Sequence, residues 1–534
     1  MAHHSNANEG IFLNPILPGF NPDPTIIRVG KDYFLATSTF EFFPGVPIYH
    51  SQDLIQWKLI GHALTRKSQL DVKTVEPGGG VWAPTLRFHE GWFYMTTCAF
   101  DRYRPQNDDR VWPRGFYVRT RDIWDSSSWS DPVYFDQPGF DQDLFWDDDG
   151  TAYLSTTYRK LDRNPGSKLK DFCIHVCSID IETGNSTSQP VLLRESASGV
   201  SEGSHIFKIG KYYYLFTAEG GTESGHSEWV MRSTNGPLGP YELGPQNPLW
   251  RNTTEHEIQN TGHCDLVDDG NGQWWAVSLG VRPHLVDGRY ETSVFGRESL
   301  LLPVTWEDDW PVFNRSQPLK LEMEGPAYKY EVPKAWRDDF KSSEMQLGWY
   351  RKNTPLKVDF ALSNESLELY GGPYALSTPA APTMFMRKQT HRQVLWTTQL
   401  NFQPASSRTE AGTTLYWNYL TYSSIGIRLV DGKRAIRFRP AQGEERIVPL
   451  STQGSDVLFA IDCQPTLYRF GYVEQNQNGA AAADVNWVGE VSTAVMTRDP
   501  SVGMPFTGMM LGLYAFGDME RCLTPATFKF AEFS

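Results

Sequence analysis

A pattern that returns about every 60 residues constrains the fold of this chain more than any other feature. Five segments pair a Gly-containing turn with a run of aromatic and β-branched residues, which is typical of β-hairpins. The segments are GKDYFLATS from Gly30, EGWFYMTT from Glu90, DGTAYLSTT from Asp149, GKYYYLFTA from Gly210 and NGQWWAVSL from Asn271. The equivalent positions within them are Tyr33, Phe93, Ala152, Tyr213 and Trp274.

Repeated hairpins without helical periodicity between them predict an all-β fold, a five-bladed β-propeller with one four-stranded sheet per blade. The repeats cover roughly residues 10–325, so we assign residues 1–325 to this domain. A solenoid is the rival architecture, but solenoid repeats are shorter and leucine-patterned, unlike these.

A distinctive residue stands ten or eleven positions before each equivalent position. These residues are Asp23 in NPDPTII, Trp82 in VWAPTLRF, Asp141 in FDQDLFW, Glu202 in SEGSHIFK and His263 in TGHCDLV. Each opens a β-prone run that leads to the hairpin turn, and the first strand of a propeller blade lines the central axis. Taken singly, each has an ordinary structural explanation, such as a turn for an Asp before Pro. Their shared phase instead predicts that all five meet at one end of the channel.

Three carboxylates converging in a concave site repel one another, so at least one pKa is expected to rise. Enzymes use such differences to divide acid and base roles between two carboxyl groups. Glycoside hydrolysis needs this pair, one to protonate the leaving oxygen and one to activate water. Phosphoryl transfer is disfavoured, because no glycine-rich phosphate loop of the right spacing is present.

Composition narrows the classes of partner. The 534 residues exceed one ordinary domain, and 40% hydrophobic with 21% charged residues excludes a mainly disordered chain. A net charge of −14 disfavours nucleic acid and acidic polymers and leaves neutral substrates unaffected. Aromatic residues make up 13% of the chain, and their rings suit the C–H faces of sugars.

No run of about 18 apolar residues is present, so we expect no membrane-spanning helix and no membrane partner. The first ten residues, MAHHSNANEG, lack the apolar core of a signal peptide. An intracellular protein and a mature secreted form both stay open. We interpret the six cysteines as buried thiols, Cys173 and Cys177 included, rather than metal ligands or a disulfide.

The C-terminal part has a different pattern. The segment EMEGPAYKYEVPKAW contains Pro and charge without clear periodicity, and we interpret residues 326–336 as a linker. Beyond it, IGIRLVDGKRAIRFR alternates around Asp431-Gly432, a strong hairpin turn. We therefore predict a β-sandwich over residues 337–534.

Several motifs carry a resemblance to a known family. The segments NPILPGFNPDPTIIRVGKDYFLATSTF, GGGVWAPTLRFHEGWFY, FDQDLFWDDDGTAYL, SEGSHIFKIGKYYYL, GGTESGHSEWVMRS and GRESLLLPVTWEDDWPVF resemble glycoside hydrolase family 43. The chain is most similar to β-xylosidase and α-L-arabinofuranosidase members that carry an added C-terminal domain. The resemblance covers nearly the whole chain and implies a five-bladed propeller with the sandwich packed against it.

The resemblance also implies roles. Asp23 matches the general base, Glu202 the general acid, and Asp141 the residue that positions the acid and tunes its pKa. Family members invert the anomeric configuration, which implies direct attack by a water that Asp23 activates. No cofactor is implied as a requirement.

The resemblance implies substrate contacts as well. Arg297 in GRES matches the arginine that holds substrate hydroxyls, and Trp82 and Phe40 match pocket-lining aromatics. His263 matches an axial histidine that in some members helps to bind a divalent cation, usually calcium, in the propeller channel. A hydrogen-bonding role for His263 stays equally open. Phe506 is the candidate for a sandwich residue that reaches the pocket, with an ordinary core position as its alternative.

Three departures from the family pattern stand out. Asp143 in FDQDLF replaces a small residue, and Ser204 stands where Pro is usual. The segment Arg102–Arg121 is rich in Arg and aromatic residues, and we expect it to influence side-chain preference.

The function expected from these features is an inverting exo-acting β-xylosidase that releases xylose from the non-reducing end of xylo-oligosaccharides. An α-L-arabinofuranosidase acting on arabinoxylan, or an enzyme with both activities, is the alternative. A non-catalytic carbohydrate-binding protein is a remote third. A homo-oligomer is compatible with the size and the sandwich domain, although no interface is recognisable in the sequence.

Overall fold

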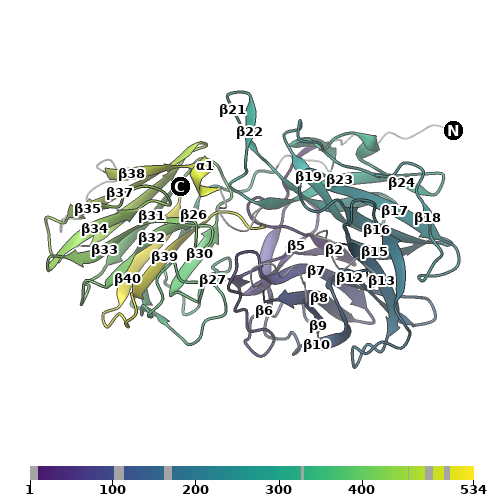
Figure 1. Cartoon of the computed structure of the whole chain (residues 1–534), viewed down its shortest axis with the longest axis horizontal. Coiled ribbons are helices and arrows are strands. Elements are labelled where there is room, and N and C mark those ends of the chain that lie inside the picture. Colours follow the sequence, from purple (N-terminus) through teal and green to yellow (C-terminus); the bar gives the residue numbers. More distant parts are fainter. Residues whose placement is uncertain are drawn as a thin grey trace.

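Each of the five predicted hairpins forms the first two strands of a four-stranded antiparallel sheet, which are the strands nearest the propeller axis. The computed structural model describes residues 10–101, 113–160, 171–325, 330–454, 456–474, 485–497 and 506–534. Regular structure in these ranges is almost entirely β-strand, arranged as a propeller beside a sandwich (Figure 1). The prediction of an all-β five-bladed propeller followed by a β-sandwich is confirmed.

The blades follow the chain in order. Blade 1 contains β2 (Thr25–Val29), β3 (Asp32–Ala36), β5 (Gly45–Ser51) and β6 (Lys58–Leu64). Blade 2 contains β7 (Gly80–His89), β8 (Trp92–Phe100), β9 (Arg114–Thr120) and β10 (Val133–Pro138). Blade 3 contains β11 (Phe140–Trp146), β12 (Ala152–Arg159), β13 (Phe172–Ile179) and β14 (Val191–Glu195).

The remaining blades have the same design. Blade 4 contains β15 (Ser201–Ile209), β16 (Tyr212–Glu219), β17 (Ser227–Ser233) and β18 (Glu242–Leu243). Blade 5 contains β19 (Gln259–Asp268), β20 (Trp274–Val281), β23 (Arg297–Glu307) and β24 (Trp310–Phe313). A hairpin of β21 (His284–Val286) and β22 (Arg289–Glu291) follows β20 in the chain and projects at the top of the molecule in Figure 1. The innermost strands β2, β7, β11, β15 and β19 contact one another in succession around the axis.

A bulge near the start of the innermost strand recurs in blades 2 to 5. The register shifts between Trp82 and Thr85, Phe140 and Asp143, Glu202 and His205, and Gly262 and Asp265. A bulge inserts an unpaired residue and turns its side chain out of the regular alternation. Repetition at one phase therefore directs one residue per blade toward the same end of the channel.

The N-terminal segment closes the propeller. β1 (Gly10–Leu13) pairs with β25 (Glu322–Gly325), which follows the last blade. The side chain of Asn14 donates to the carbonyl oxygen of Leu301 at 2.9 Å and accepts from its amide at 2.8 Å. The chain thus runs along blade 5 before it enters blade 1, and this fastens the first blade to the last.

The C-terminal domain consists of two stacked sheets. One contains β28 (Phe360–Ser363), β29 (Ser366–Leu369), β40 (Ala526–Phe533), β31 (Val394–Asn401), β36 (Val457–Cys463), β37 (Leu467–Glu474) and β38 (Asn486–Ser492), with β26 (Trp336–Asp338) on β40. The other contains β30 (Met384–Lys388), β39 (Met510–Gly517), β32 (Thr409–Tyr416), β33 (Tyr422–Val430), β34 (Lys433–Arg439) and β35 (Arg446–Pro449). The predicted turn at Asp431-Gly432 joins β33 to β34.

Helical structure is minimal in the described ranges: a 3₁₀ turn at Asn314–Ser316 and the short helix α1 (Thr493–Met496). No helix found there has the length and apolarity that a bilayer crossing requires. All six cysteines are buried thiols outside any disulfide, as predicted.

The two domains share a core and a strand pairing. β27 (Arg351–Lys352) of the C-terminal part pairs with β4 (Phe42–Phe43) of the propeller. One apolar cluster spans the interface, with Phe20, Phe40 and Phe42 on the propeller side and Tyr350, Met384, Met386, Tyr416, Met510 and Tyr514 on the sandwich side. The sandwich therefore forms a continuous packed body with the propeller, at the edge that carries Phe40.

Candidate active site

The structure brings the three predicted carboxylates together. Asp141 is buried, and its Oδ2 accepts the amide of Gly203 at 3.0 Å, the residue after Glu202. The pKa of Asp141 lies well above its ordinary value, because burial disfavours the charge and the carboxylates of Glu202 and Asp23 add to the effect. The carboxyl of Asp141 therefore resists ionisation beside the two other carboxylates.

Asp23 is held by two donors. The hydroxyl of Ser38 donates to its Oδ2 at 2.5 Å, and Nη1 of Arg297 donates to its Oδ1 at 2.8 Å. Asp23 adopts a φ of 53°, and Asp141 and His263 adopt 53° and 57°. Such left-handed geometry is uncommon for residues with a side chain and clusters at functional sites.

Arg297 lies at the centre of the contacts around Asp23. Its Nη1 also donates to the hydroxyl of Thr222 at 3.3 Å. Its Nε and Nη2 each lie 3.4 Å from the carbonyl oxygen of Phe506. The guanidinium is 5.3 Å from the ring centroids of both Phe40 and Phe506, within cation–π range. Arg297 thus joins the propeller carboxylate to the sandwich domain.

Phe506 reaches this site from the sandwich. Its ring is parallel to that of Phe40, with centroids 5.6 Å apart and an interplanar angle of 1°. The approach depends on two facing glycines, since a Cβ on Gly296 would lie 2.6 Å from the oxygen of Thr507, and one on Gly508 would lie 2.2 Å from that of Phe295. Only residues without a side chain let the two backbones come this close.

Trp82 completes an aromatic wall with Phe40 and Phe506. Its ring centroid lies 6.4 Å from that of Phe506, and its Nε1 donates to the carbonyl oxygen of Gly78 at 2.9 Å. The wall is built from the ends of two blades and one sandwich segment. It therefore provides apolar faces beside the carboxylates.

His263 is packed against Gly203, where a Cβ would lie 2.9 Å from its Nδ1. Burial lowers the pKa of His263 to about 4, so the imidazole is neutral at pH 7. A second histidine, His226, also lies beside the site, and the Asp23 and Arg297 charges act on its titration. Burial lowers the pKa of His226 to about 4, and one ring nitrogen contacts the carbonyl oxygen of Asn260 at 2.9 Å.

Sequence reasoning did not assign Ser38, Thr222 or His226 to the site. None of them stands at the shared phase of the repeat. Thr222 and His226 lie between β16 and β17, in the GGTESGHSEW stretch, which was noted only for its resemblance. The glycines and the histidine of this stretch were the only sequence signal that could have indicated a loop at the site.

Two sequence families cover most of the chain. Residues 12–311 match "Glycosyl hydrolases family 43", and residues 337–534 match "Beta xylosidase C-terminal Concanavalin A-like domain". The chain belongs to glycoside hydrolase family 43. It is an exo-acting glycoside hydrolase.

Named relatives cover most of this chain. A non-reducing end alpha-L-arabinofuranosidase of Bacteroides ovatus is 35% identical over 98% of this family 43 chain and 94% of its own length. A xylan 1,3-beta-xylosidase of a Vibrio species is 36% identical over 76% of this chain and 77% of its own. The structure of a xylan beta-1,4-xylosidase from Bacillus halodurans superposes with a TM-score of 0.87, at 29% identity, over 98% of this chain and all of that one.

In this family 43 enzyme an arginine that is 14% exposed fills the channel below the carboxylates. Arg87 on β7 contacts Asp143 through Nε and Asp265 through Nη1, each at 2.9 Å. His205 lies 3.1 Å from Asp143 and 3.0 Å from Arg87. Burial alone would lower the pKa of Arg87, but the two carboxylates outweigh it and raise the pKa. Asp143, which departs from the family pattern, is therefore a partner of Arg87.

This arrangement does not fit a calcium ion. Calcium takes six to eight oxygen ligands, whereas the buried carboxylates here already neutralise a guanidinium that occupies the axis. No group of three His, Cys, Asp or Glu suited to a metal occurs within the described ranges. His263, the predicted ligand, packs on Gly203 instead. We derive no catalytic step through a metal.

Replacing Arg87 by Ala is expected to lower the free energy of unfolding by about 3–5 kcal/mol, because it leaves buried carboxylates without their cation. The side chains of Asp143 and Asp265 are 1% and 0% exposed. Denaturant titration measures the change, with Lys67→Ala as the control. Lys67 is 56% exposed in its pair with Asp71, so its loss should cost about 0–1 kcal/mol. Equal effects of the two variants would contradict this account.

The segment Arg102–Arg121 is only partly described. Residues 102–112 lie outside the described residues, so their predicted influence on side-chain preference stays a prediction. Its second half forms regular structure, because β9 runs from Arg114 to Thr120 within blade 2.

Proposed function

We propose that this enzyme releases xylose from the non-reducing end of xylo-oligosaccharides, with inversion of the anomeric configuration. The observation that carries the proposal is the contact of Arg297 with both Asp23 and Phe506. A sandwich residue thereby closes one side of the carboxylate site, which suits a single terminal sugar rather than the interior of a polymer.

The three carboxylates divide the chemistry. Glu202 donates its proton to the leaving oxygen as the glycosidic C–O bond breaks. A water attacks the anomeric carbon from the opposite face, and Asp23 accepts the proton that this water loses. Asp141 lies in the same buried site, and burial together with the charge of Glu202 raises the pKa of Asp141. Two such neighbouring carboxyls resist full ionisation, which favours a protonated acid before reaction.

The surrounding residues position these groups. Ser38 and Arg297 orient the carboxylate of Asp23, and each carboxylate oxygen retains a second lone pair for water. The aromatic wall of Trp82, Phe40 and Phe506 stacks against the C–H faces of the sugar. The cation at the channel axis is the Arg87 guanidinium, so we expect activity to be independent of added calcium or chelator.

An α-L-arabinofuranosidase is the second candidate, because the Bacteroides ovatus relative is named as one and aligns over 98% of the chain. Arabinofuranose and xylopyranose present similar hydroxyls to Arg297, so one site can accept both.

The deciding experiment compares kcat/KM for xylobiose with that for an arabinose-decorated xylo-oligosaccharide and identifies the released sugar. We expect xylose at the higher efficiency, and proton NMR at early times should show the α-anomer from the β-linked substrate. Arabinose release with xylobiose untouched supports the second candidate. Early β-xylose would contradict the role of Asp23 as base, and release of neither sugar would contradict both candidates.

A further inference from the structure

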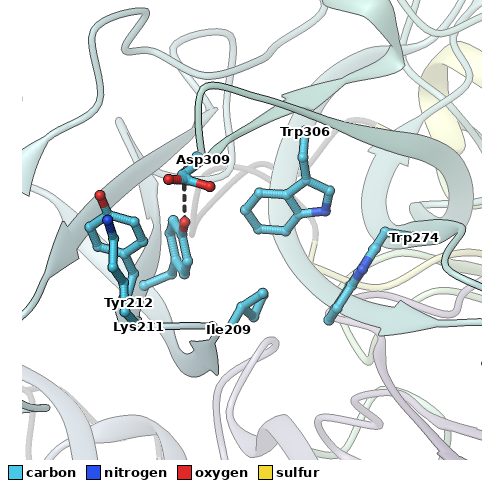
Figure 2. Close-up of a pocket in the computed structure, with 8 residues that line it drawn as sticks. Ile209, Lys211, Tyr212, Trp274, Trp306 and Asp309 are labelled. Atoms are coloured by element: carbon cyan, nitrogen blue, oxygen red, sulfur yellow. Dashed lines mark hydrogen bonds between the residues drawn. The ribbon is translucent and has the colours of Figure 1, made fainter.

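A groove lies at the far end of blades 4 and 5, away from the carboxylates. It encloses about 470 Å³ and is lined by Ile209, Gly210, Lys211, Tyr212, Tyr214, Trp274, Trp306 and Asp309 (Figure 2). This volume lies within the ~300–1,000 Å³ typical of small-molecule sites. None of the residues that form the candidate active site lines it.

The groove is separated from the active site by the length of a strand. β15 begins at Ser201, beside the catalytic Glu202, and ends at Ile209 in the groove. Seven residues of extended strand correspond to about 23 Å. A ligand in the groove therefore does not contact the reacting atoms.

The walls of the groove are held in place from behind. The turn Asp308-Asp309 joins β23 to β24, and the hydroxyl of Tyr214 donates to the carbonyl oxygen of Asp309 at 2.5 Å (Figure 2). Arg232 donates to the carbonyl oxygens of Asp308 and Asp309 at 3.2 and 3.1 Å, and its guanidinium lies 4.2 Å from the ring centroid of Tyr212. The groove is thus formed before any ligand arrives.

Aromatic rings dominate the groove. Trp274 and Trp306 are each only partly buried against the core beneath. Arg232 and Lys211 instead lie over the ring of Tyr212, at 4.2 and 4.9 Å. The rings of Trp274 and Trp306 lie 5.8 Å apart at 75°, so they present faces in two directions (Figure 2). Partly exposed aromatic faces bind the C–H patches of pyranose rings, while hydroxyls at the ring edges remain free for polar groups.

The charges at the rim indicate a neutral ligand. Lys211 and Asp309 are both exposed and of opposite sign, so the groove has no net charge on a chain whose net charge is −14. An anionic ligand would need several cations here, and a cationic one several carboxylates. One donor and one acceptor beside aromatic faces match the hydroxyls of a neutral sugar.

We propose that this groove is a second, non-catalytic saccharide site that binds the backbone of a neutral β-linked xylan. The choice of xylan rests on the proposed function, whereas the groove itself does not. Binding there holds a polymer on the enzyme while chain ends exchange at the distant active site.

Affinity electrophoresis in gels with and without soluble arabinoxylan tests the proposal. We expect the polymer to retard the wild-type protein, and Trp274→Ala to weaken the apparent affinity about tenfold or more. Trp92→Ala is the matched control, because Trp92 opens β8 just after the hairpin turn of blade 2, as Trp274 opens β20 in blade 5. The ring of Trp92 is covered by Arg119 and Arg121 at 4.8 and 4.4 Å, so its loss should leave the retardation unchanged.

Two readouts keep the groove separate from the active site. Trp274→Ala should retain wild-type kcat/KM on xylobiose, which also reports that the variant is folded. Retardation of the wild-type protein should persist in excess xylose and arabinose, which occupy the active site. Retardation abolished by these sugars, unchanged in Trp274→Ala, or absent from the wild type would overturn the proposal. Wild-type activity on xylobiose without retardation would refute the groove site alone.

Discussion

Replacing Glu202 by Gln is expected to reduce kcat on xylobiose by about 10²–10⁴-fold, the usual contribution of a general acid. Gln has nearly the same shape as Glu, but it has no proton to give to the leaving oxygen. An aryl xyloside with a strongly acidic leaving phenol needs little protonation, so its loss should be much smaller. Steady-state kinetics on the two substrates measures this difference.

The pH profile provides an independent check of the same role. A general acid must be protonated, so the loss of its proton should set the alkaline limb of kcat/KM, and Glu202→Gln should remove that limb. Glu195→Gln is the control, because Glu195 is 50% exposed in blade 3 and pairs with Lys160 at the surface. Equal losses on both leaving groups would show that Glu202 does not act as the acid.

Replacing Asp23 by Asn is expected to lower kcat on both kinds of leaving group by a similar factor of about 10²–10⁴, because water activation is needed whatever departs. Asn tolerates the left-handed backbone at this position, where φ is 53°, so the fold should be retained. A base must be deprotonated, and the acid limb of kcat/KM should therefore disappear. Rates measured from pH 4 to 9 on both substrates provide the comparison.

Asp23→Gly offers a test that a merely structural role would not pass. Glycine accepts the same φ and leaves space for a small anion. Azide needs no deprotonation, so it should restore turnover of an activated aryl β-xyloside and yield the α-xylosyl azide. Ser38→Ala keeps the carboxylate and loses only its 2.5 Å hydrogen bond, so it should reduce kcat far less than Asp23→Asn. No rescue by azide, together with a large loss in Ser38→Ala, would indicate that Asp23 only supports the local structure.

The positions of the predicted site residues could be predicted from the repeat because each of the five propeller blades contains the same strand–turn–strand unit. The innermost strands of blades 2 to 5 have their bulge at the same phase, and Asp23 precedes the innermost strand of blade 1 at the equivalent position, so equivalent residues in the sequence become neighbours in space. Asp23, Asp141 and Glu202 were recognisable for this reason. Ser38, Thr222 and His226 were not, because they lie at other phases and meet the site only after the blades close.

The contacts inside the propeller channel could not be predicted from the sequence either. Asp143 stood out as a departure from the family pattern, but its partner Arg87 lies on another blade, and nothing local connects them. Calcium was a reasonable expectation from resemblance, and it failed to fit once a guanidinium was found between two buried carboxylates. Which carboxylates an arginine neutralises in a protein interior depends on their distance in space and not on their separation in the sequence.

The sequence by itself determined the class of fold, the number of blades, the hairpin turns and the residue that each blade directs toward the axis. These follow from turn chemistry and strand alternation, which act over a few residues. Only the tertiary structure decided that Arg297 joins Asp23 to Phe506, that Arg87 fills the channel, and that an aromatic groove forms on blades 4 and 5. Such contacts join residues up to 274 positions apart, and packing and charge pairing between them arise only when the whole chain is compact.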